Sequence, residues 1–428
     1  MRLTVCLSAG LKDVTVRRWN KVWRCRGRFY DYPPAVPQAL RDHGVEIVEM
    51  NQIKPVMQKW KPPVDDPRFA EPVPAEKLPD WHAEPVFTHS SNIRLFEGAK
   101  QACLIANAQH FEGFPPAVDR LIGAVEVPNK ELRLQRAIML SQVWNTDETV
   151  LPKRFDPRKP RWSWGRRLGI TNLKSSQILM RDILRLSRSQ VAEYPSLRHQ
   201  LQATDLLLHS HVNYRGTPIV MKESLDLLLM SDQTLPPFAG QDMVQASAEH
   251  RLPDMWPVLP TVDFVQSNQY QLNSHTGLAS CNTLTCPHTV VQFPRKYHWE
   301  DKHYTASQIM TCLMLTAAQA RHRYGENVKV LPEPISIQHV LLEQDHFLFT
   351  FFQLNTLDLD AGTGIKNLVW TTQRSQLFEK ILGQPWMPQA LRPDRYLSFN
   401  PSAFDQFLAV YFNGVPEISA NRHLTVES

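Results

Sequence analysis

The stretch from Thr305 to Leu354 constrains the fold more than any other part of this 428-residue chain. Apolar residues fill most of its first twenty positions and Gly325 follows them, which predicts a helix over 305–324 with Thr305 as its cap. From Ile335 onward the apolar period changes to two around a polar turn, which predicts a β-hairpin. Together with the absence of regular helix–strand alternation, this predicts an α+β fold: mixed helices with a sheet that contains an antiparallel hairpin.

Helical periodicity recurs in other parts of the chain. The segments that show it are 92–110, 130–144, 175–194 and 401–412. In the third of these, Arg181, Arg185 and Arg188 recur at helical spacing on a face other than the apolar one. The apolar residues of this third helix are expected to form a buried stripe, with the arginines on another face.

Proline divides the chain into an arm and a body. Eleven of the 33 prolines lie between residues 29 and 90. Proline fixes the backbone φ angle and cannot donate to a β-ladder, so this density predicts an extended arm over 29–90. The remainder, 91–428, is expected to form the α+β body as one domain or two lobes.

Positive charge gathers in two short blocks, although the net charge is only +5. Residues 1–28 hold eight Lys or Arg, with Asp13 as the one acid, interleaved with apolar residues. A basic, acid-poor amphipathic start is typical of a mitochondrial presequence, so we predict residence in the mitochondrial matrix. The alternative is a basic tail that is retained.

The second basic block is the segment 153–167, KRFDPRKPRWSWGRR, and it predicts an RNA contact. Its candidate RNA-binding residues are Lys153, Arg154, Arg158, Lys159, Arg161, Trp162, Trp164, Arg166 and Arg167. Cationic side chains pair with phosphates, and exposed indole rings stack on unpaired bases. The prolines disfavour a helix, so an exposed loop is expected here. The alternative is a solvated basic loop whose tryptophans dock back on the body.

A search for catalytic and metal-binding motifs finds no nucleotide-binding, hydrolase or metalloprotease signature. Cys281 and Cys286, with His288 near them and His275 and His298 flanking, are at the limit of zinc-ligand spacing and lack a second pair. Asp358 and Asp360 favour a turn over a metal site. We therefore expect no enzyme, metal, cofactor or small-molecule substrate. No apolar run approaches the ~18 residues of a membrane-spanning helix, so no membrane partner is expected.

Several segments resemble one family, the mitochondrial large ribosomal subunit protein numbered thirty-seven of animal mitoribosomes. The strongest is FFQLNTLDLDAGTGIKNLVW at 351–370. The others, in the family's order, are IRLFEGAKQACLIANAQHFEGFP at 93–115, WNTDETVLPKR at 144–154, RSQVAEYPSL at 188–197, AQARHRYGENVKVLPEP at 318–334 and AFDQFLAVYFNG at 403–414. None is a catalytic motif. The basic block after Phe155 has no counterpart in this pattern, so its RNA contact rests on chemistry alone.

The resemblance implies a structural component of the mitochondrial large ribosomal subunit, acting in translation without an enzymatic role. It also implies contacts with large-subunit rRNA and with other mitochondrial ribosomal proteins, including a related paralogous subunit as a heterodimer partner. Two other functions are open alternatives. One is a matrix enzyme whose site would use Asp358, Asp360 and the Cys281–Cys286 region, and the other is a free mitochondrial RNA-binding regulator.

Overall fold

A computed structural model of the chain describes most of the body and a short part of the N-terminal region. The described residues are 37–45, 72–143, 149–153, 155–156, 158–163, 166, 168–275, 286–295, 299–360, 364–381, 383 and 394–418. The chain divides into two units, residues 1–72 and 73–428.

The first unit has one described element, helix α3 (Gln38–Asp42), and all of its side chains are exposed. The predicted presequence 1–28 lies outside the described residues, as does most of the predicted arm 29–90. The last part of that arm is different, because 81–89 forms a strand of the main sheet. The arm interpretation missed this strand since Pro85 interrupts its apolar pattern, and Pro is tolerated where its neighbours leave the ladder irregular.

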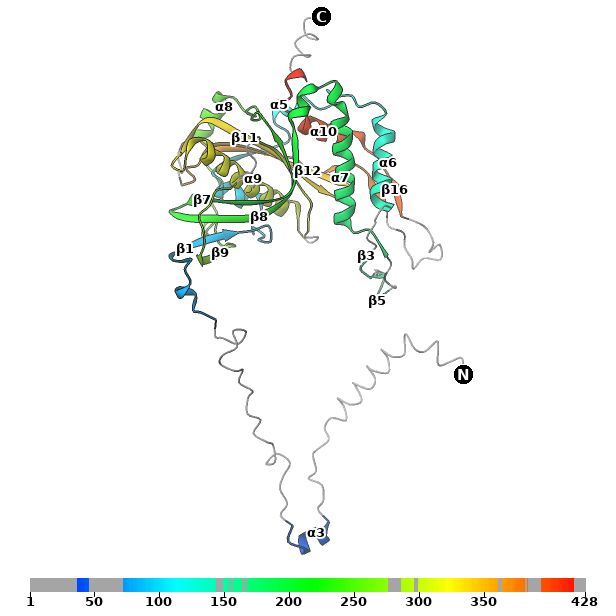
Figure 1. Cartoon of the computed structure of the whole chain (residues 1–428), viewed down its shortest axis with the longest axis vertical. Coiled ribbons are helices and arrows are strands. Elements are labelled where there is room, and N and C mark those ends of the chain that lie inside the picture. Colours follow the sequence, from blue (N-terminus) through cyan, green and yellow to red (C-terminus); the bar gives the residue numbers. More distant parts are fainter. Residues whose placement is uncertain are drawn as a thin grey trace, which may run out of the picture. The chain divides into compact units, whose positions relative to one another are not determined.

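A ten-stranded mixed sheet forms the centre of the second unit (Figure 1). Its main path runs β2-β13-β12-β11-β10-β8-β1-β9, with β7 paired to β8 and β14 to β12. The strands are β1 (Trp81–His89), β2 (Ala108–Glu112), β7 (Leu201–Tyr214), β8 (Thr217–Ser231), β9 (Val265–Gln269), β10 (Cys286–Gln292), β11 (Val330–Glu343), β12 (His346–Thr356), β13 (Asn367–Thr371) and β14 (Ser375–Gln376). Helices and this mixed sheet confirm the predicted α+β class.

The hairpin predicted over 335–354 is confirmed as β11 and β12, which pair antiparallel from Ile335–Leu354 to Glu343–His346. Both faces of β12 are buried, so its aromatic residues divide between two cores. Phe347, Phe349 and Phe351 belong to one core, whereas Phe352 and Leu354 belong to the other. This division explains why the strand is almost continuously apolar.

Helix α9 (Asp301–Tyr324) covers one face of the sheet together with α4 (Ala99–Ile105). It is the helix predicted over 305–324, but it begins one turn earlier. Glu300, not Thr305, is the cap: its side chain accepts from the backbone of His303, and the His303 side chain accepts from the backbone of Glu300. Thr305 lies inside the helix and is buried.

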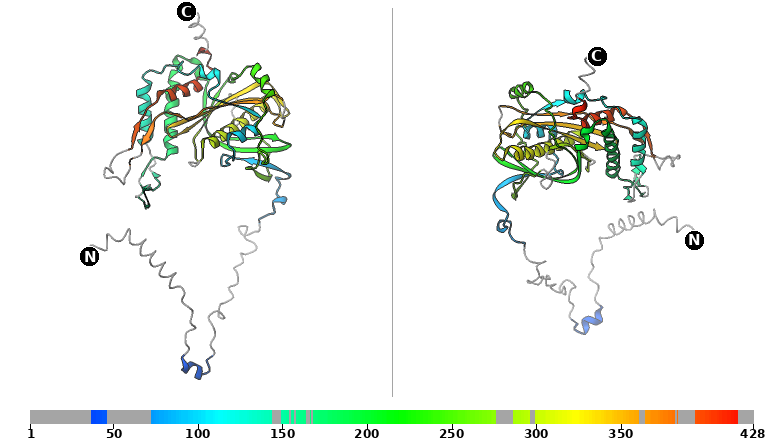
Figure 2. Two further views of the ribbon diagram at one scale, coloured as in Figure 1. Left: turned by 180° about the vertical axis from the view of Figure 1, so that it is seen from behind. Right: turned by 45° about the horizontal axis from the view of Figure 1, so that its top comes forward.

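Helices α5 (Pro116–Asp119), α6 (Lys130–Val143), α7 (Asn172–Arg188) and α10 (Pro401–Tyr411) pack on the other core. Three of them confirm the helices predicted at 130–144, 175–194 and 401–412. Helices α6 and α7 lie side by side in every view (Figures 1 and 2), joined by a 2.7 Å hydrogen bond from Gln142 Nε2 to Ser175 Oγ. The remaining short helices are α8 (Gln241–Ala246) and the 3₁₀ turns η1 (Ala75–Lys77), η2 (Ser189–Ala192), η3 (Pro195–His199) and η4 (Ser247–Glu249).

The helix predicted over 92–110 is wrong at both ends. Helix α4 spans seven residues, and residues 108–112 form strand β2 instead. Asn107 has a φ of 46°, a left-handed conformation that ends the helix and turns the chain into the strand. Strand β2 then pairs in parallel with β13, which lies about 260 residues further along the chain. Such a distant partner leaves no local signal in the sequence.

The family-like segment at 351–370 has a structural role in this fold. The Asn367 amide is buried: its Oδ1 accepts from the backbone of Asn355 and Thr356, and its Nδ2 donates to the carbonyls of Ala106 and Thr356. Asn355 Nδ2 donates in turn to the Lys366 carbonyl at 2.8 Å. These amides join β12, β13 and the α4–β2 turn, because buried backbone groups outside regular ladders need side-chain partners.

Candidate nucleic-acid interface

The basic block 153–167 forms a β-hairpin where an exposed loop was predicted. Strand β4 (Phe155–Asp156) pairs with β5 (Lys159–Ser163), and Asp156 lies opposite Lys159. Asp followed by Pro favours a tight chain reversal at this point, so the prolines that exclude a helix are compatible with a hairpin. Below it, β3 (Thr149–Val150) pairs with β6 (Leu168–Gly169). We call the segment 149–169 the basic ribbon.

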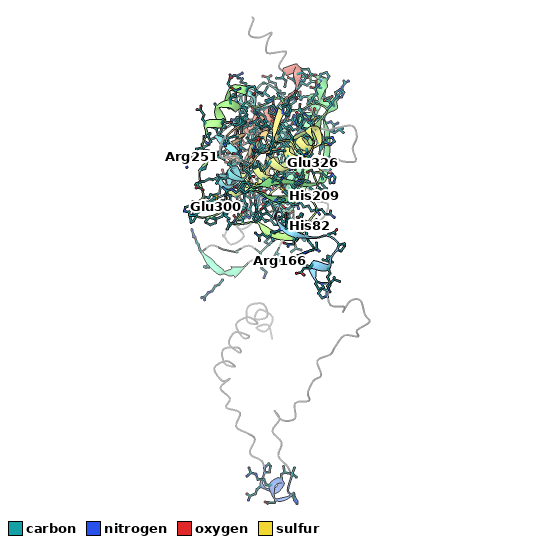
Figure 3. The ribbon with its side chains drawn as sticks, turned by 90° about the vertical axis from the view of Figure 1, so that its left-hand side faces the viewer. His82, Arg166, His209, Arg251, Glu300 and Glu326 are labelled. Carbon is teal, nitrogen blue, oxygen red and sulfur yellow. The ribbon has the colours of Figure 1, made fainter. Side chains whose placement is uncertain are left out.

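The basic ribbon lies beyond one end of α7, away from the large sheet (Figure 1), and its Arg166 is labelled below the body in Figure 3. Five of the nine candidate residues have described, exposed side chains: Lys153, Arg158, Lys159, Arg161 and Arg166. Trp162 is described only as part of strand β5, and Arg154, Trp164 and Arg167 lie outside the described residues. The structure therefore brings five exposed cations onto one narrow ribbon.

Helix α7 continues the positive charge away from the ribbon. Thr171 caps the helix, with its side chain accepting from the backbone of Lys174 at 3.3 Å. The apolar face of α7 is buried, whereas Arg181, Arg185 and Arg188 are exposed, as their spacing predicts. Arg185 also has an acid one turn away, with its Nη1 3.8 Å from Asp182 Oδ1. An exposed pair of this kind contributes little energy, so it leaves the guanidinium open to a phosphate.

A second exposed surface is apolar instead of charged, and the sequence did not predict it. The segment 252–265, which we call the apolar loop, exposes 85% of Trp256, 62% of Leu259 and 56% of Val262. The exposed Phe96 adjoins it, since its backbone N–H donates to Asp263 Oδ2 at 2.8 Å. The available signal was a run with Trp, Leu and Val but no Lys or Arg between residues 252 and 265.

The apolar loop is held in place by a buried amide. Gln101 Nε2 donates to the Pro260 carbonyl at 2.6 Å and to Asp263 Oδ2 at 3.0 Å. Gln101 is itself completely buried at the start of α4. The exposed apolar side chains are therefore presented by an anchored segment, which makes this loop a candidate for protein contact.

The zinc alternative finds no support around Cys286. Its thiol is buried, and Arg323 Nη2 lies 3.1 Å from the sulfur. His288 is also buried and contacts the Asn413 carbonyl at 2.9 Å, while Cys281 and His298 lie outside the described residues. Within the part of the chain that the structure describes, no group of three His, Cys, Asp or Glu side chains has metal-binding geometry.

The two aspartates of the enzyme alternative make structural contacts with segments that are distant in the sequence. The Asp358 carbonyl accepts from Asn107 Nδ2 at 3.0 Å, and Asp360 Oδ1 accepts from the backbone N–H of Arg215. One contact uses a backbone carbonyl and the other a carboxylate, and their partners come from different parts of the chain. No helix among the described residues is long and apolar enough to cross a membrane.

The sequence of this chain is similar to those of known large-subunit ribosomal proteins. The "Large ribosomal subunit protein mL37" of Rattus norvegicus is 28% identical over 84% of this chain and 83% of its own length. The proteins of the same name from Bos taurus and Gallus gallus are 27% and 26% identical, over 93% and 89% of this chain and 93% and 85% of their own lengths. No family model matches the chain. The chain is therefore similar to mL37 proteins over most of its length, in agreement with the resemblance of its 351–370 segment.

The similarity to these proteins also confirms the predicted localisation in the mitochondrion. The names of the relatives describe ribosomal proteins and not enzymes. The matches extend over most of the chain in each case, so the similarity is not confined to one motif.

Proposed function

We propose that this protein is a structural component of the mitochondrial large ribosomal subunit and acts in mitochondrial translation. The observation that carries the proposal is similarity to mL37 proteins along 84–93% of the chain. Three features support a scaffold role: buried amides at chain crossings, one charged and one apolar exposed surface, and aspartates that make structural contacts. In this role the chain binds rRNA at one surface and ribosomal proteins at others.

The basic ribbon and the arginine face of α7 are the proposed rRNA contact. The ribbon has five exposed cations in the described part of 153–166, and α7 adds three more. A narrow two-stranded ribbon can follow a groove or a loop, and its Lys and Arg side chains bind phosphates with release of counterions. Trp162 and Trp164 are proposed to stack on unpaired bases.

The apolar loop is the proposed contact with a neighbouring ribosomal protein. Between residues 255 and 265 the one charged residue is Asp263, and its carboxylate is already bound by Gln101 and by the Phe96 backbone. Such a surface has no means of binding phosphate, whereas an exposed tryptophan with aliphatic neighbours is typical of a protein interface. The related paralogous subunit that the family resemblance implies is a suitable partner for it.

Sedimentation of the tagged full chain from mitochondrial lysate tests the proposal. After a wash at 1 M salt the Debye length is about 3 Å, so contacts held by surface charge alone are released. We expect the protein to remain in the large-subunit peak at one copy per subunit. Recovery in light fractions would contradict a structural role, and sub-stoichiometric binding to transcripts would favour the free RNA-binding regulator.

A matched pair of variants separates the protein contact from the RNA contact. Trp256→Asp with Leu259→Asp places two charges on the apolar loop, and Gln202→Asp with Thr234→Asp adds the same charges at exposed polar positions. We expect the first pair to lower occupancy in salt-washed subunits roughly tenfold or more, because interface anchors contribute on the order of 2 kcal/mol each. Equal occupancy of both variants would sink the apolar-loop assignment.

A further inference from the structure

Strand β8 has a gap along one of its two edges. On that edge β1 pairs in parallel with Ile219–Met221, and β10 pairs antiparallel with Leu227–Ser231. Both partner strands therefore run toward residues 222–226 and end there. Ligand sites favour the carboxyl ends of strands at points where a sheet changes its connection, and this gap has that character.

A cavity of about 170 Å³ occupies the gap. Glu223 and Asp226 from β8 line it, together with Asn92 after β1, Arg295 after β10, and Trp299, Tyr304 and Ser307 at the start of α9. The cavity is below the roughly 300–1,000 Å³ of sites for drug-sized ligands. It therefore accepts a small molecule or a single side chain.

Glu223 is the chemically unusual group in this cavity. The residue is only 4% exposed, and its Oε1 accepts from Gln292 Nε2 at 2.9 Å. Its Oε2 lies 2.8 Å from Thr311 Oγ1, whose one hydrogen is also within reach of the Ser307 carbonyl at 2.9 Å. Among the described residues no Lys or Arg forms an ion pair with it. The nearby Arg295 is bound to Asp226 instead, with Nη2 2.6 Å from Oδ1. Burial raises the pKa of the Glu223 carboxyl to about 7.

A series of hydrogen bonds between buried side chains ends at Glu223. Thr350 Oγ1 donates to Gln308 Oε1 at 3.0 Å, and Gln308 Nε2 donates to His339 Nδ1 at 2.9 Å. The other nitrogen of a neutral His339 then donates to Gln292 Oε1 at 2.8 Å, and Gln292 donates to the carboxylate. Burial lowers the pKa of His339 to about 3, which keeps it neutral.

The Gln292 amide at the end of this series donates to Glu223, yet no described residue supplies a counter-ion in contact with the carboxylate. Desolvated carboxylates are costly unless they are paired, so the missing partner is a cation. Aromatic rings attract organic ammonium groups through their π faces, and Trp299 and Tyr304 both line the cavity. The described residues have no third carboxylate or imidazole placed to complete a metal site.

We propose that this cavity binds a small primary ammonium group, with Glu223 as its counter-charge and Trp299 and Tyr304 as its aromatic walls. The free amine of a small metabolite and the ammonium of a lysine side chain share this chemistry. The site is separate from the basic ribbon and the apolar loop. None of its lining residues belongs to the basic ribbon or to the apolar loop, so variants of the cavity can be tested apart from both.

Calorimetric titration of the full chain with n-butylammonium tests the site, with n-butanol as the neutral probe of equal length. We expect saturable binding of the amine and none of the alcohol. The amine stays charged throughout, whereas Glu223 changes from about one-tenth to about nine-tenths ionised between pH 6 and pH 8. The affinity should therefore rise roughly tenfold over this range. The other titratable groups around Glu223 are Asp226, Arg295, Cys312 and, through Gln292, His339.

Glu223→Gln should lower the affinity for the amine at least roughly tenfold at pH 8 and remove its pH dependence, while exposed Glu97→Gln should change neither. Equal binding of butanol, or an affinity that is flat with pH, would overturn the proposal. If Glu223→Gln does not fold, the pH series and the alcohol comparison on the natural chain still decide it. Failure of this test leaves the sedimentation result for the ribosomal role unaffected.

Discussion

The basic ribbon and the body to which it is attached are stabilised by different physics. The ribbon has short strands and exposed cations, and its chemistry is that of permanent charge in water. The body has two apolar cores and buried polar groups that are kept neutral, such as His288 and His339. Binding by the ribbon should therefore depend on salt, whereas stability of the body should depend on pH. Each variable provides a way to perturb one region and leave the other intact.

The largest expected effect is acid destabilisation of the body. Burial lowers the pKa of His89 and His288 to about 4 and of His339 to about 3, from 6.5 when unfolded. Below pH 6.5 the unfolded chain binds protons that the folded chain does not, so the free energy of unfolding decreases as the pH is lowered. Glu223, with a raised pKa, opposes this change. Between pH 8 and pH 5 we expect a net loss on the order of 4 kcal/mol, measured by urea unfolding. A flat profile would contradict it.

The next largest effect is expected when the apolar loop loses the side chain that anchors it to the core. Gln101→Leu removes both hydrogen bonds to the loop and leaves the Pro260 carbonyl without its donor. We expect a cost of about 2–3 kcal/mol and faster amide exchange at Val258, Val262 and Phe264. Gln241→Leu, at an exposed position, is the control. Unchanged exchange in the loop would mean that Gln101 does not anchor it.

Neutralising the ribbon should change RNA binding without changing stability. Replacing Lys153, Arg161 and Arg166 by Gln should weaken binding roughly tenfold and lower the salt slope by about 2–3, at 0.7–0.9 per phosphate contact. The loss should be uniform across RNA sequences. Lys77, Arg251 and Lys329, all exposed, give a control of equal charge when changed to Gln. Equal slopes for the two triple variants would remove the ribbon from the RNA interface.

The smallest effect concerns the junction of the two regions. Thr171 caps α7 at the end from which the ribbon emerges. Thr171→Ala should cost about 1 kcal/mol in unfolding free energy, because the Lys174 N–H loses its partner. Thr204→Ala, on exposed β7, should cost less. Amide exchange would show the difference at the start of α7, and protection equal to that of the unmodified chain would argue against the cap.

Local signals predicted several elements whose partners are close in sequence, although the β7–β8 hairpin, which turns between Tyr214 and Thr217, was not among them. The β11–β12 hairpin and helices α6, α7, α9 and α10 each have their periodicity and end signals within their own residues. Strands β1 and β2 were missed because their partners are far away in the chain. Pairing at that distance depends on the assembled sheet. The residues of β1 therefore indicate an extended arm, and those of β2 indicate the end of a helix.

The positive charge of the candidate RNA-binding segment was predicted from the sequence, but its hairpin structure was not. Seven cations in fifteen residues are a strong signal of an anion-binding segment, but the hairpin depends on pairing that the prolines disguise. The apolar loop was missed because exposure of Trp256 and Leu259 is a property of the folded surface. Nothing in a sequence distinguishes an apolar residue in the core from one that is held outside it.

The parallel pairing of β2 with β13 also has a consequence for synthesis. Asn367 binds the carbonyl of Ala106, 261 residues earlier in the chain. At ~5–20 residues per second, the ribosome that makes this protein needs roughly 15–50 s to supply that partner. Throughout this interval β2 and the adjacent α4 have emerged without the strand that completes their edge of the sheet. The unpaired edge of β2 in a newly made chain is therefore exposed for longer than the edges of the last strands. Holding chaperones would be needed most during this interval.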